Sequence, residues 1–289
     1  MKNLEELNTI IGELDSYLSN TFTYVDDSLA KIYESMKYSL FSGGKRIRPL
    51  LCMITYNELA ENPTLDKILP FAATLEMIHT YSLIHDDLPA MDDDDLRRDK
   101  PTNHKVYSEA VAILAGDGLL NMSMEVISKY MESLDDIDEL KKCIKALKFI
   151  YNSSGVLGMI GGQLLDIDYL NEQYNEELCE DMYSLKTAAL LKASIVTGAI
   201  MAGCDGEIIT KLKEFGQYIG LAYQYKDDLL DMNKDLKNGQ KTMLDFYSAE
   251  EIENEIKSLT NKGLESIKDI EFKDDILKDF CLALIKREY

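Results

Sequence analysis

The chain has 289 residues, of which 46% are hydrophobic, and it carries a formal net charge of −21 at pH 7. This length and apolar fraction suffice for a large folded domain, so disorder is not expected. The negative charge argues against binding to nucleic acid or to an anionic membrane surface, because like charges repel. For the same reason, an anionic substrate would need cations to bind here.

The sequence shows no sign of export or membrane insertion. The N-terminus, from Met1 to Glu6, lacks the charged-then-apolar plan of a signal peptide, and we expect no stretch long and apolar enough to span a bilayer. Five cysteines are scattered without metal-ligand spacing: Cys52, Cys143, Cys179, Cys204 and Cys281. They predict reduced core thiols in a cytoplasmic protein.

Apolar residues recur at helical spacing along most of the chain, as in the runs from Phe71 to Asp86 and from Phe215 to Asp227. Asn238-Gly239, with the Lys/Asp-rich residues before it, predicts a loop at 232–241. No low-complexity linker divides the chain. We therefore predict one all-α domain over residues 1–289. Bundle, solenoid and irregular helical array remain open, although the absence of a visible repeat weakens the solenoid.

Two acidic clusters stand at the ends of apolar helical runs, where carboxylates are usually sparse. The first follows His85 and extends from Asp86 to Asp95, and the second extends from Lys226 to Asp231. Carboxylates combined with water and phosphate oxygens are typical of magnesium sites built around a diphosphate. A solvated acidic surface explains either cluster alone, but two on apolar helices favour cation binding.

The spacing within the clusters limits which carboxylates can act together. Asp227 and Asp231 are four residues apart and share a helix face, whereas Asp228 lies about 100° round the helix. In the first cluster, a straight helix would align Asp86 with Asp93. Pro89 prevents a regular helix there, and a local bulge would instead bring Asp92 to Asp86. The spacing leaves both choices open.

Basic residues form the second notable pattern in this acidic chain. Lys45 and Arg48 follow Gly43-Gly44 and can converge on one anion from adjacent helical positions. Arg97-Arg98 directly follows the first acidic cluster, where charge balancing is the simpler explanation. His79 lies seven residues before Asp86, on the same helix face and about 10 Å away. A satisfied core histidine is the alternative there.

Two more polar groups interrupt apolar stretches. Lys186 and Thr187 begin an apolar helix, where the lysine could equally be a surface charge. Gln163 and Asp166 form a polar pair three residues apart after Gly161-Gly162.

Five motifs occur in order: GGKRIRP, the stretch from His85 to Arg98 followed by PTNH, GGQLLD, KTAAL and YQYKDDLLD. Together they resemble the trans-prenyl diphosphate synthases, most closely the short-chain bacterial farnesyl and geranylgeranyl diphosphate synthases. The resemblance covers nearly the whole chain. It implies a single-domain all-α helical bundle of the isoprenoid synthase type, built around a deep central cavity and usually found as a homodimer.

The resemblance also implies roles for individual residues. Carboxylates of both clusters would hold about three magnesium ions against an allylic diphosphate, either directly or through water: Asp86, Asp87, Asp92, Asp227, Asp228 and Asp231. That substrate would be surrounded by Arg97, Lys186, Thr187, Gln224 and Lys241. Isopentenyl diphosphate would bind without metal at Gly44, Lys45, Arg48, His79 and Arg98. Manganese suits the same oxygen ligands, so the choice of metal stays open.

The implied reaction is ionisation, condensation and elimination. Metal ions and basic side chains stabilise the departing diphosphate, with Asp86 and Asp227 holding the metal. The double bond of isopentenyl diphosphate attacks the allylic cation, and the departed diphosphate takes the proton. Oxygen dipoles near Lys186, Thr187 and Gln224 would face the cation, in a cavity that excludes water.

Tyr81 predicts the length of the product. It lies five residues before Asp86, so its ring would close the channel some 7–8 Å beyond the metals, at about 1.5 Å per residue. An aromatic residue there is similar to bacterial farnesyl diphosphate synthases, which favours a C15 product. Geranylgeranyl diphosphate remains the alternative, with Tyr81 an ordinary core residue.

The chain departs from the family pattern after the second cluster. The segment from Met232 to Thr242 is shorter than usual, so either Lys241 or Lys234 would meet the diphosphate. This shortening is the one feature that favours a catalytically weak partner subunit of another synthase. A terpene cyclase would need neither GGKRIRP nor a second aspartate motif. A structural cation-binding protein would bind metal without diphosphate.

Overall fold

The computed structural model describes residues 2–22, 26–168, 174–238 and 241–287. Nearly all of this part of the chain is helical, which confirms the predicted all-α class. Two compact units form: unit 1 comprises Met1–Met53 and Leu65–Cys143, and unit 2 comprises Ile54–Thr64 and Ile144–Tyr289. The division falls inside helices α3 (Ile47–Leu59) and α7 (Ile137–Ser154), so each of them contributes residues to both units.

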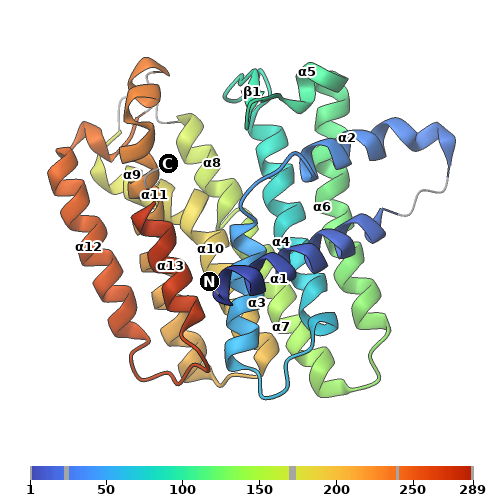
Figure 1. The fold of residues 1–289 in the computed structure, drawn as a ribbon. Coiled ribbons are helices and arrows are strands. Elements are labelled where there is room, and N and C mark those ends of the chain that lie inside the picture. Colours follow the sequence, from blue (N-terminus) through green and yellow to red (C-terminus); the bar gives the residue numbers. More distant parts are fainter. Residues whose placement is uncertain (1, 23–25, 169–173, 239–240, 288–289) are drawn as a thin grey trace. The chain divides into compact units, whose positions relative to one another are not determined.

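Unit 1 is built around helix α4, which runs over Leu65–Asp86 and packs along α6 (Glu109–Glu132) (Figure 1). Most of α4 is buried, and its residues Phe71, Leu75 and Ile78 are fully enclosed. Each such side chain contributes about 1.5–3 kcal/mol through burial. The rest of unit 1 comprises these elements: α1 (Lys2–Thr21), η1 (Asp27–Leu29), α2 (Ala30–Leu40), β1 (Leu96–Arg97), β2 (Lys100–Pro101) and α5 (Asn103–Tyr107).

A short β-hairpin follows α4 and was not predicted from the sequence. Strands β1 and β2 pair antiparallel, and the two residues between them, Arg98 and Asp99, have φ of 55° and 61°. Positive φ at both central positions is the pattern of a type I′ turn, which usually contains Asn-Gly or Asp-Gly. Because this turn is Arg-Asp, the ordinary sequence signal was absent. Non-glycine residues with positive φ often mark functional sites.

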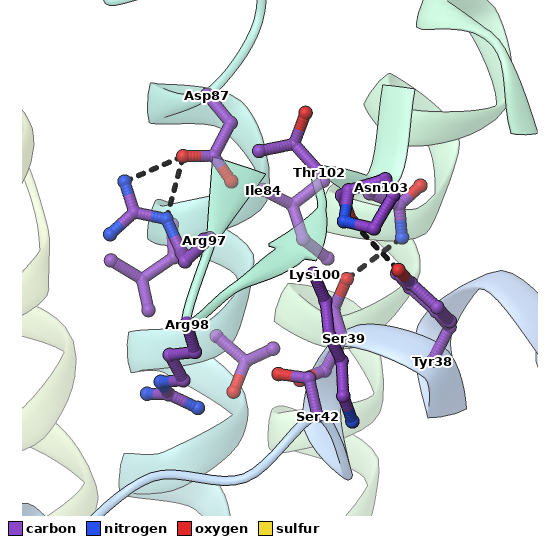
Figure 2. Close-up of a pocket in the computed structure, with 13 residues that line it drawn as sticks. Tyr38, Ser39, Ser42, Ile84, Asp87, Arg97, Arg98, Lys100, Thr102 and Asn103 are labelled. Carbon is purple, nitrogen blue, oxygen red and sulfur yellow. Dashed lines mark hydrogen bonds and ion pairs between the residues drawn. The ribbon is translucent and has the colours of Figure 1, made fainter. Parts of the chain in front are cut away.

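Asn103 fastens the end of the hairpin to α2. Its Nδ2 donates to the Ser35 carbonyl at 2.9 Å and to Ser39 Oγ at 2.8 Å, while its Oδ1 accepts from Ser35 Oγ at 2.8 Å. Tyr38 adds a hydrogen bond from its hydroxyl to the Pro101 carbonyl at 2.7 Å. Figure 2 shows Asn103, Ser39 and Tyr38 together beside the hairpin. Asn103 is 2% exposed, so its amide depends on these partners.

Unit 2 is built around α10 (Ala189–Ala202) and the long helix α11 (Gly206–Asn238). Helix α10 is buried on nearly all sides, as expected of a uniformly apolar sequence. Helix α12 packs along α11 (Figure 1). The remaining elements of this unit are α8 (Met159–Asp168), α9 (Glu176–Tyr183), η2 (Ser184–Ala188), η3 (Met243–Asp245), α12 (Ala249–Ser266) and α13 (Ile276–Lys286).

Residues 54–64 belong to unit 2 because they hold the start of α13. Glu58 Oε1 accepts the Ile276 backbone N–H at 2.8 Å, and Lys273 Nζ donates to the Asn57 carbonyl at 3.1 Å. Glu58 is 4% exposed, and burial raises the pKa of its carboxyl. The beginning of α13 is thus fixed by a buried carboxylate.

The predicted loop at 232–241 is wrong over most of its length, because α11 continues to Asn238. The residues from Met232 to Asn238 include charged side chains but neither glycine nor proline, and charged residues such as Lys are compatible with a helix. Gly239 and Gln240 lie outside the described residues.

The expectation that no stretch could span a bilayer is also wrong by length and composition. Glu109–Glu132 and Glu176–Ala202 are both long and apolar enough, with 39% and 72% of their apolar windows buried inside the protein. Buried core helices of globular proteins have the same composition.

The five cysteines are free thiols, as predicted. All are buried except Cys204, which is half-buried. Burial raises the pKa of the Cys143, Cys179 and Cys204 thiols to about 11, which keeps them protonated and unreactive.

We predict that Asn103→Ala destabilises the protein by about 2–3 kcal/mol, because buried groups of α2 lose their partners. Chemical denaturation measures the change. Asn121→Ala is the matched control, since Asn121 is exposed and its side chain bonds only within α6, to the Asp117 carbonyl. Equal effects of the two substitutions would contradict the anchoring role.

Candidate active site

The first acidic cluster begins where α4 ends. Asp86 is the last residue of the helix, and the backbone N–H of Asp92 donates to the Asp86 carbonyl at 2.9 Å. Asp93 has φ of 51° and its N–H donates to the Leu88 carbonyl at 3.1 Å. The chain therefore folds back at Pro89 and brings the backbone of Asp92 beside Asp86. A helix end, rather than a bulge within the helix, produces this approach.

Asp87 is turned inward and paired with Arg97 of the hairpin. The Arg97 Nε and one terminal nitrogen contact Asp87 Oδ1 at 2.6 and 2.5 Å, and Asp94 lies 3.7 Å from that terminal nitrogen. Burial raises the pKa of the Asp87 carboxyl, while Arg97 opposes this shift. The sequence analysis placed Asp87 with the metals and Arg97 with the substrate, but the structure joins them to each other (Figure 2).

Arg98, at the tip of the hairpin, packs against the Gly43-Gly44 segment. One of its terminal nitrogens donates to the Gly43 carbonyl. A Cβ at Gly44 would lie 2.6 Å from the Arg98 guanidinium, and the φ of Gly44 is 126°. The backbone conformation therefore favours glycine here, and any side chain would displace the Arg98 guanidinium. The GGKRIRP motif and the hairpin thus meet within unit 1, as the grouping of Gly44 with Arg98 anticipated.

Arg48 and His79 also come together, with Arg48 Nη1 and His79 Nε2 at 3.2 Å. The pKa of His79 lies well below its usual value, first because of burial and then because of Arg48, Arg98 and Arg97. A neutral imidazole surrounded by guanidinium groups leaves a net positive region suited to an anion. Four predicted site residues of unit 1 therefore lie close together: Arg48, His79, Arg97 and Arg98.

Two other cations of the GGKRIRP motif behave differently. Arg46 is 6% exposed and pairs with Asp15 at 3.0 Å and Glu76 at 2.7 Å, so it holds α1 and α4 together. Lys45 is exposed. A narrow cleft next to the hairpin is lined by side chains that include Tyr38, Ser42, Ile84, Arg97, Arg98 and Lys100 (Figure 2).

In unit 2, Lys186 and Thr187 lie in a π-helical turn, η2, between α9 and α10, rather than at the start of an α-helix. Glycines of two neighbouring helices press against this turn. A Cβ at Gly162 would lie 2.2 Å from the Lys186 backbone nitrogen, and one at Gly220 would lie 2.5 Å from the Ala188 Cβ. π-turns are frequent at functional sites because they redirect side chains.

A continuous set of hydrogen bonds connects this turn to the second acidic cluster. Thr187 Oγ1 donates to Gln224 Oε1 at 2.7 Å, and Gln224 Nε2 donates to Asp228 Oδ1 at 3.0 Å. The Tyr183 hydroxyl donates to Asp228 Oδ2 at 2.5 Å and accepts the Met243 N–H at 3.1 Å. Burial and the nearby Asp228 raise the pKa of Tyr183, so the phenol stays protonated.

These bonds separate the aspartates of the second cluster by role. Asp228 is 2% exposed and both its oxygens accept hydrogen bonds, so it positions Gln224 and Tyr183. Asp227 and Asp231 lie one turn apart on α11, and Asp231 is exposed. Asp227 pairs with Arg287, which the sequence analysis did not single out. Only the charge of Arg287 near the C-terminus was visible in the sequence.

Two lysines of unit 2 that were predicted to contact the diphosphate also have acidic partners within the protein. Lys186 Nζ forms an ion pair with Asp166 of the GGQLLD motif. Lys241 is nearly half exposed and lies 3.9 Å from Asp245. The side chain of Lys234 lies outside the described residues.

The carboxylates of the two acidic clusters suit magnesium better than a metal ion that is coordinated by protein side chains alone. In the described part of the chain, no group of three or more His, Cys, Asp or Glu residues could hold a metal ion. Magnesium dehydrates reluctantly and is usually held by one or two carboxylates, waters and substrate phosphate. Asp86 beside Asp92, and Asp227 a turn from Asp231, offer such sparse oxygen ligands.

A polyprenyl synthetase family model matches residues 29–253. The chain belongs to the polyprenyl synthetase family. It is 38% identical over 274 residues to a farnesyl diphosphate synthase of Bacillus subtilis (strain 168), covering 91% of this chain and 90% of the relative. It is also 38% identical over 275 residues to a geranylgeranyl diphosphate synthase of Cyanophora paradoxa, covering 87% and 89%.

The solved structures of polyprenyl synthetase relatives agree with this assignment. A geranyltransferase of Helicobacter pylori, complexed with magnesium and isoprenyl diphosphate, superposes with a TM-score of 0.84 at 28% identity, covering 99% of this chain and 97% of that one. The chain thus has the all-α isoprenoid synthase fold.

We predict that His79 makes stability fall at low pH. Its folded pKa is lowered, so below the unfolded value of about 6.5 the unfolded chain binds a proton that the folded protein resists. The contribution of neutral His79 to the free energy of unfolding is fully present above about pH 6.5. It is lost as the pH falls towards the pKa of His79 in the folded protein. Chemical denaturation between pH 7.5 and 5 should show a smaller fall in the free energy of unfolding for His79→Asn than for the wild type. Parallel curves for the two proteins would contradict the prediction.

We predict that Gly162→Ala destabilises unit 2 by about 1–3 kcal/mol, because the added methyl group overlaps the backbone of η2. Gly12→Ala is the matched control. Nothing lies within 4 Å of a Cβ at Gly12 in α1, so alanine there should add about 0.5–1 kcal/mol of helix stability. Thermal unfolding of both variants measures the effects. If Gly162→Ala left the thermal stability unchanged, α8 would not pack closely against the π-turn.

Proposed function

We propose that this chain is a short-chain trans-prenyltransferase that condenses an allylic diphosphate with isopentenyl diphosphate and yields farnesyl diphosphate. The main support is the gathering of Arg48, Arg98 and Arg97 around a neutral His79 in unit 1, next to the carboxylates that end α4. A protein with a net charge of −21 concentrates positive charge there, as binding of an anionic substrate requires.

Isopentenyl diphosphate would bind at this basic region without metal. Arg48 and Arg98 would supply forked guanidinium groups to its phosphate oxygens, with exposed Lys45 as an additional cation. The positive φ and close approach at Gly44 keep a side chain from filling the space beside Arg98. His79 would donate or accept a hydrogen bond as a neutral group, without adding charge.

Magnesium would be held by Asp86 and Asp92 from the first cluster and by Asp227 and Asp231 from the second. We expect about three ions, as the family resemblance implies, with manganese as an alternative. When bound, magnesium would neutralise the departing diphosphate of the allylic substrate. Asp87 and Asp228 would act indirectly, because Arg97 occupies one oxygen of Asp87, and Gln224 and Tyr183 occupy both oxygens of Asp228.

Lys186, Thr187, Gln224 and Lys241 would surround the allylic end of the reaction, together with Arg97. Thr187 donates its proton to Gln224, so its oxygen lone pairs remain free to face a developing cation. Lys186 would exchange Asp166 for a phosphate oxygen. Arg97, held by Asp87, would present its remaining N–H groups to the allylic diphosphate.

Tyr81 would set the product length. It is 6% exposed, and its ring packs edge-on against His85 with centroids 5.8 Å apart. His85 is in turn fixed by the Ile113 carbonyl at 3.0 Å and by close contact with Gly116. A ring held in this way would form a rigid end wall, which favours the C15 product over geranylgeranyl diphosphate.

We further propose a single functional domain over residues 1–289, a homodimer, and a cytoplasmic location without membrane insertion. Helix α6 carries exposed apolar side chains suited to a subunit interface, namely Ile113 at 45%, Leu114 at 58% and Met124 at 36% exposure.

A product assay tests the proposed activity. Purified protein receives dimethylallyl diphosphate, labelled isopentenyl diphosphate and magnesium, and the dephosphorylated products are separated by length. We expect farnesol from the wild type and longer alcohols from Tyr81→Ala, because alanine opens the end wall. Tyr107→Ala, outside α4, is the control and should keep the wild-type product. Geranylgeraniol from the wild type would reject the role of Tyr81, and no elongation would reject the activity.

A further inference from the structure

Arg287 lies directly after the last helical residue of α13 and reaches α11 at the second acidic cluster. Its guanidinium forms an ion pair with Asp227 Oδ1 and lies 3.9 Å from the centre of the Tyr223 ring. The same group donates to the Tyr223 carbonyl at 3.3 Å and to the Leu284 carbonyl at 2.5 Å. The Tyr223 ring and two backbone carbonyls therefore hold one cation against one carboxylate.

This contact is more than a surface ion pair. The Arg287 side chain is only 10% exposed, whereas that of Asp227 is 34% exposed. Exposed pairs generally contribute little because water solvates both partners. Here the arginine is covered by the Tyr223 ring and the helix, so its charge is directed at Asp227. Planar stacking with a forked donor is specific to arginine.

We propose that Arg287 competes with the divalent metal for Asp227, so that Asp227 binds metal only after Arg287 has moved away. This inference rests on the proposed role of Asp227 as a metal ligand. Two cations that require the same carboxylate oxygen exclude each other, both by contact and by charge repulsion. A diphosphate accompanied by its metal brings negative charge to the cluster and so favours the exchange more than the free metal does.

The position of Arg287 makes such an exchange feasible. The residue is outside α13, with φ of −57° and ψ of 146°, so the helix need not unwind when the side chain leaves. The start of α13 is held separately by Glu58, through the Ile276 N–H. The helix can therefore remain docked in unit 2 while only its final side chain moves.

The experiment measures binding of manganese, as a paramagnetic substitute for magnesium, by the electron paramagnetic resonance signal of the free ion. Titrations are run with and without inorganic diphosphate on the full chain. Arg287→Met removes the charge but keeps similar bulk. Lys286→Met is the matched control, because Lys286 is the exposed neighbour and its replacement changes the net charge equally.

We expect Arg287→Met to tighten manganese binding about fivefold relative to Lys286→Met, since a competing ion pair of about 1 kcal/mol corresponds to that ratio. This gain in manganese affinity should be larger in the absence of diphosphate than in its presence. Arg287→Lys should fall between the wild type and Arg287→Met. Unchanged or weaker binding in Arg287→Met would overturn the competition.

Asp227→Asn separates this inference from the proposed function. If Asp227 is a ligand, Asp227→Asn weakens manganese binding, and adding Arg287→Met to it produces no further change. If Asp227→Asn leaves binding unaltered, the metal assignment itself fails. If Asp227→Asn weakens binding but Arg287→Met has no effect on the wild-type background, only the competition fails. Thermal unfolding of each variant confirms that it is folded.

Discussion

The ion pair between the buried Asp87 and the half-buried Arg97 is the contact on which the candidate site of unit 1 depends. It fixes the β-hairpin to the end of α4, and the hairpin in turn carries Arg98 to Gly43 and Gly44. Burial of Asp87 would be costly without the guanidinium, because an isolated buried carboxylate favours its neutral form. One internal pair therefore fixes the hairpin that carries Arg98 to the proposed anion site.

The same principle recurs in unit 2. Lys186 is paired with Asp166, and Asp227 is paired with Arg287. Lys186 and Asp227, which are both proposed to meet a ligand, thus already have a partner of opposite charge within unit 2. Binding then becomes an exchange of partners rather than the pairing of exposed charges, so less of the desolvation cost falls on the ligand. An acidic chain can hold these cations in place through such pairs.

The sequence predicted the helical class and singled out most residues of the candidate site as hypotheses, because motifs and apolar periodicity are local signals. It also predicted Asp92 as one of two candidates beside Asp86. Features that depend on distant partners were missed. The hairpin turn was missed because Arg98-Asp99 is not a standard turn pair, and Arg287 was missed because its role comes from contact with Asp227. The loop before Gly239 was misplaced, since charged residues suit a helix as well as a loop.

The π-turn that contains Lys186 and Thr187 has a consequence for how this family can vary. A π-turn holds one more residue than an α-helical turn, so deletion of one residue from Ser184–Ala188 would restore a regular helix. Every residue before the deletion would then rotate by about 100° relative to α10. The length of this segment is therefore constrained independently of its side chains, and an alignment gap there would mark a relative that has lost the site.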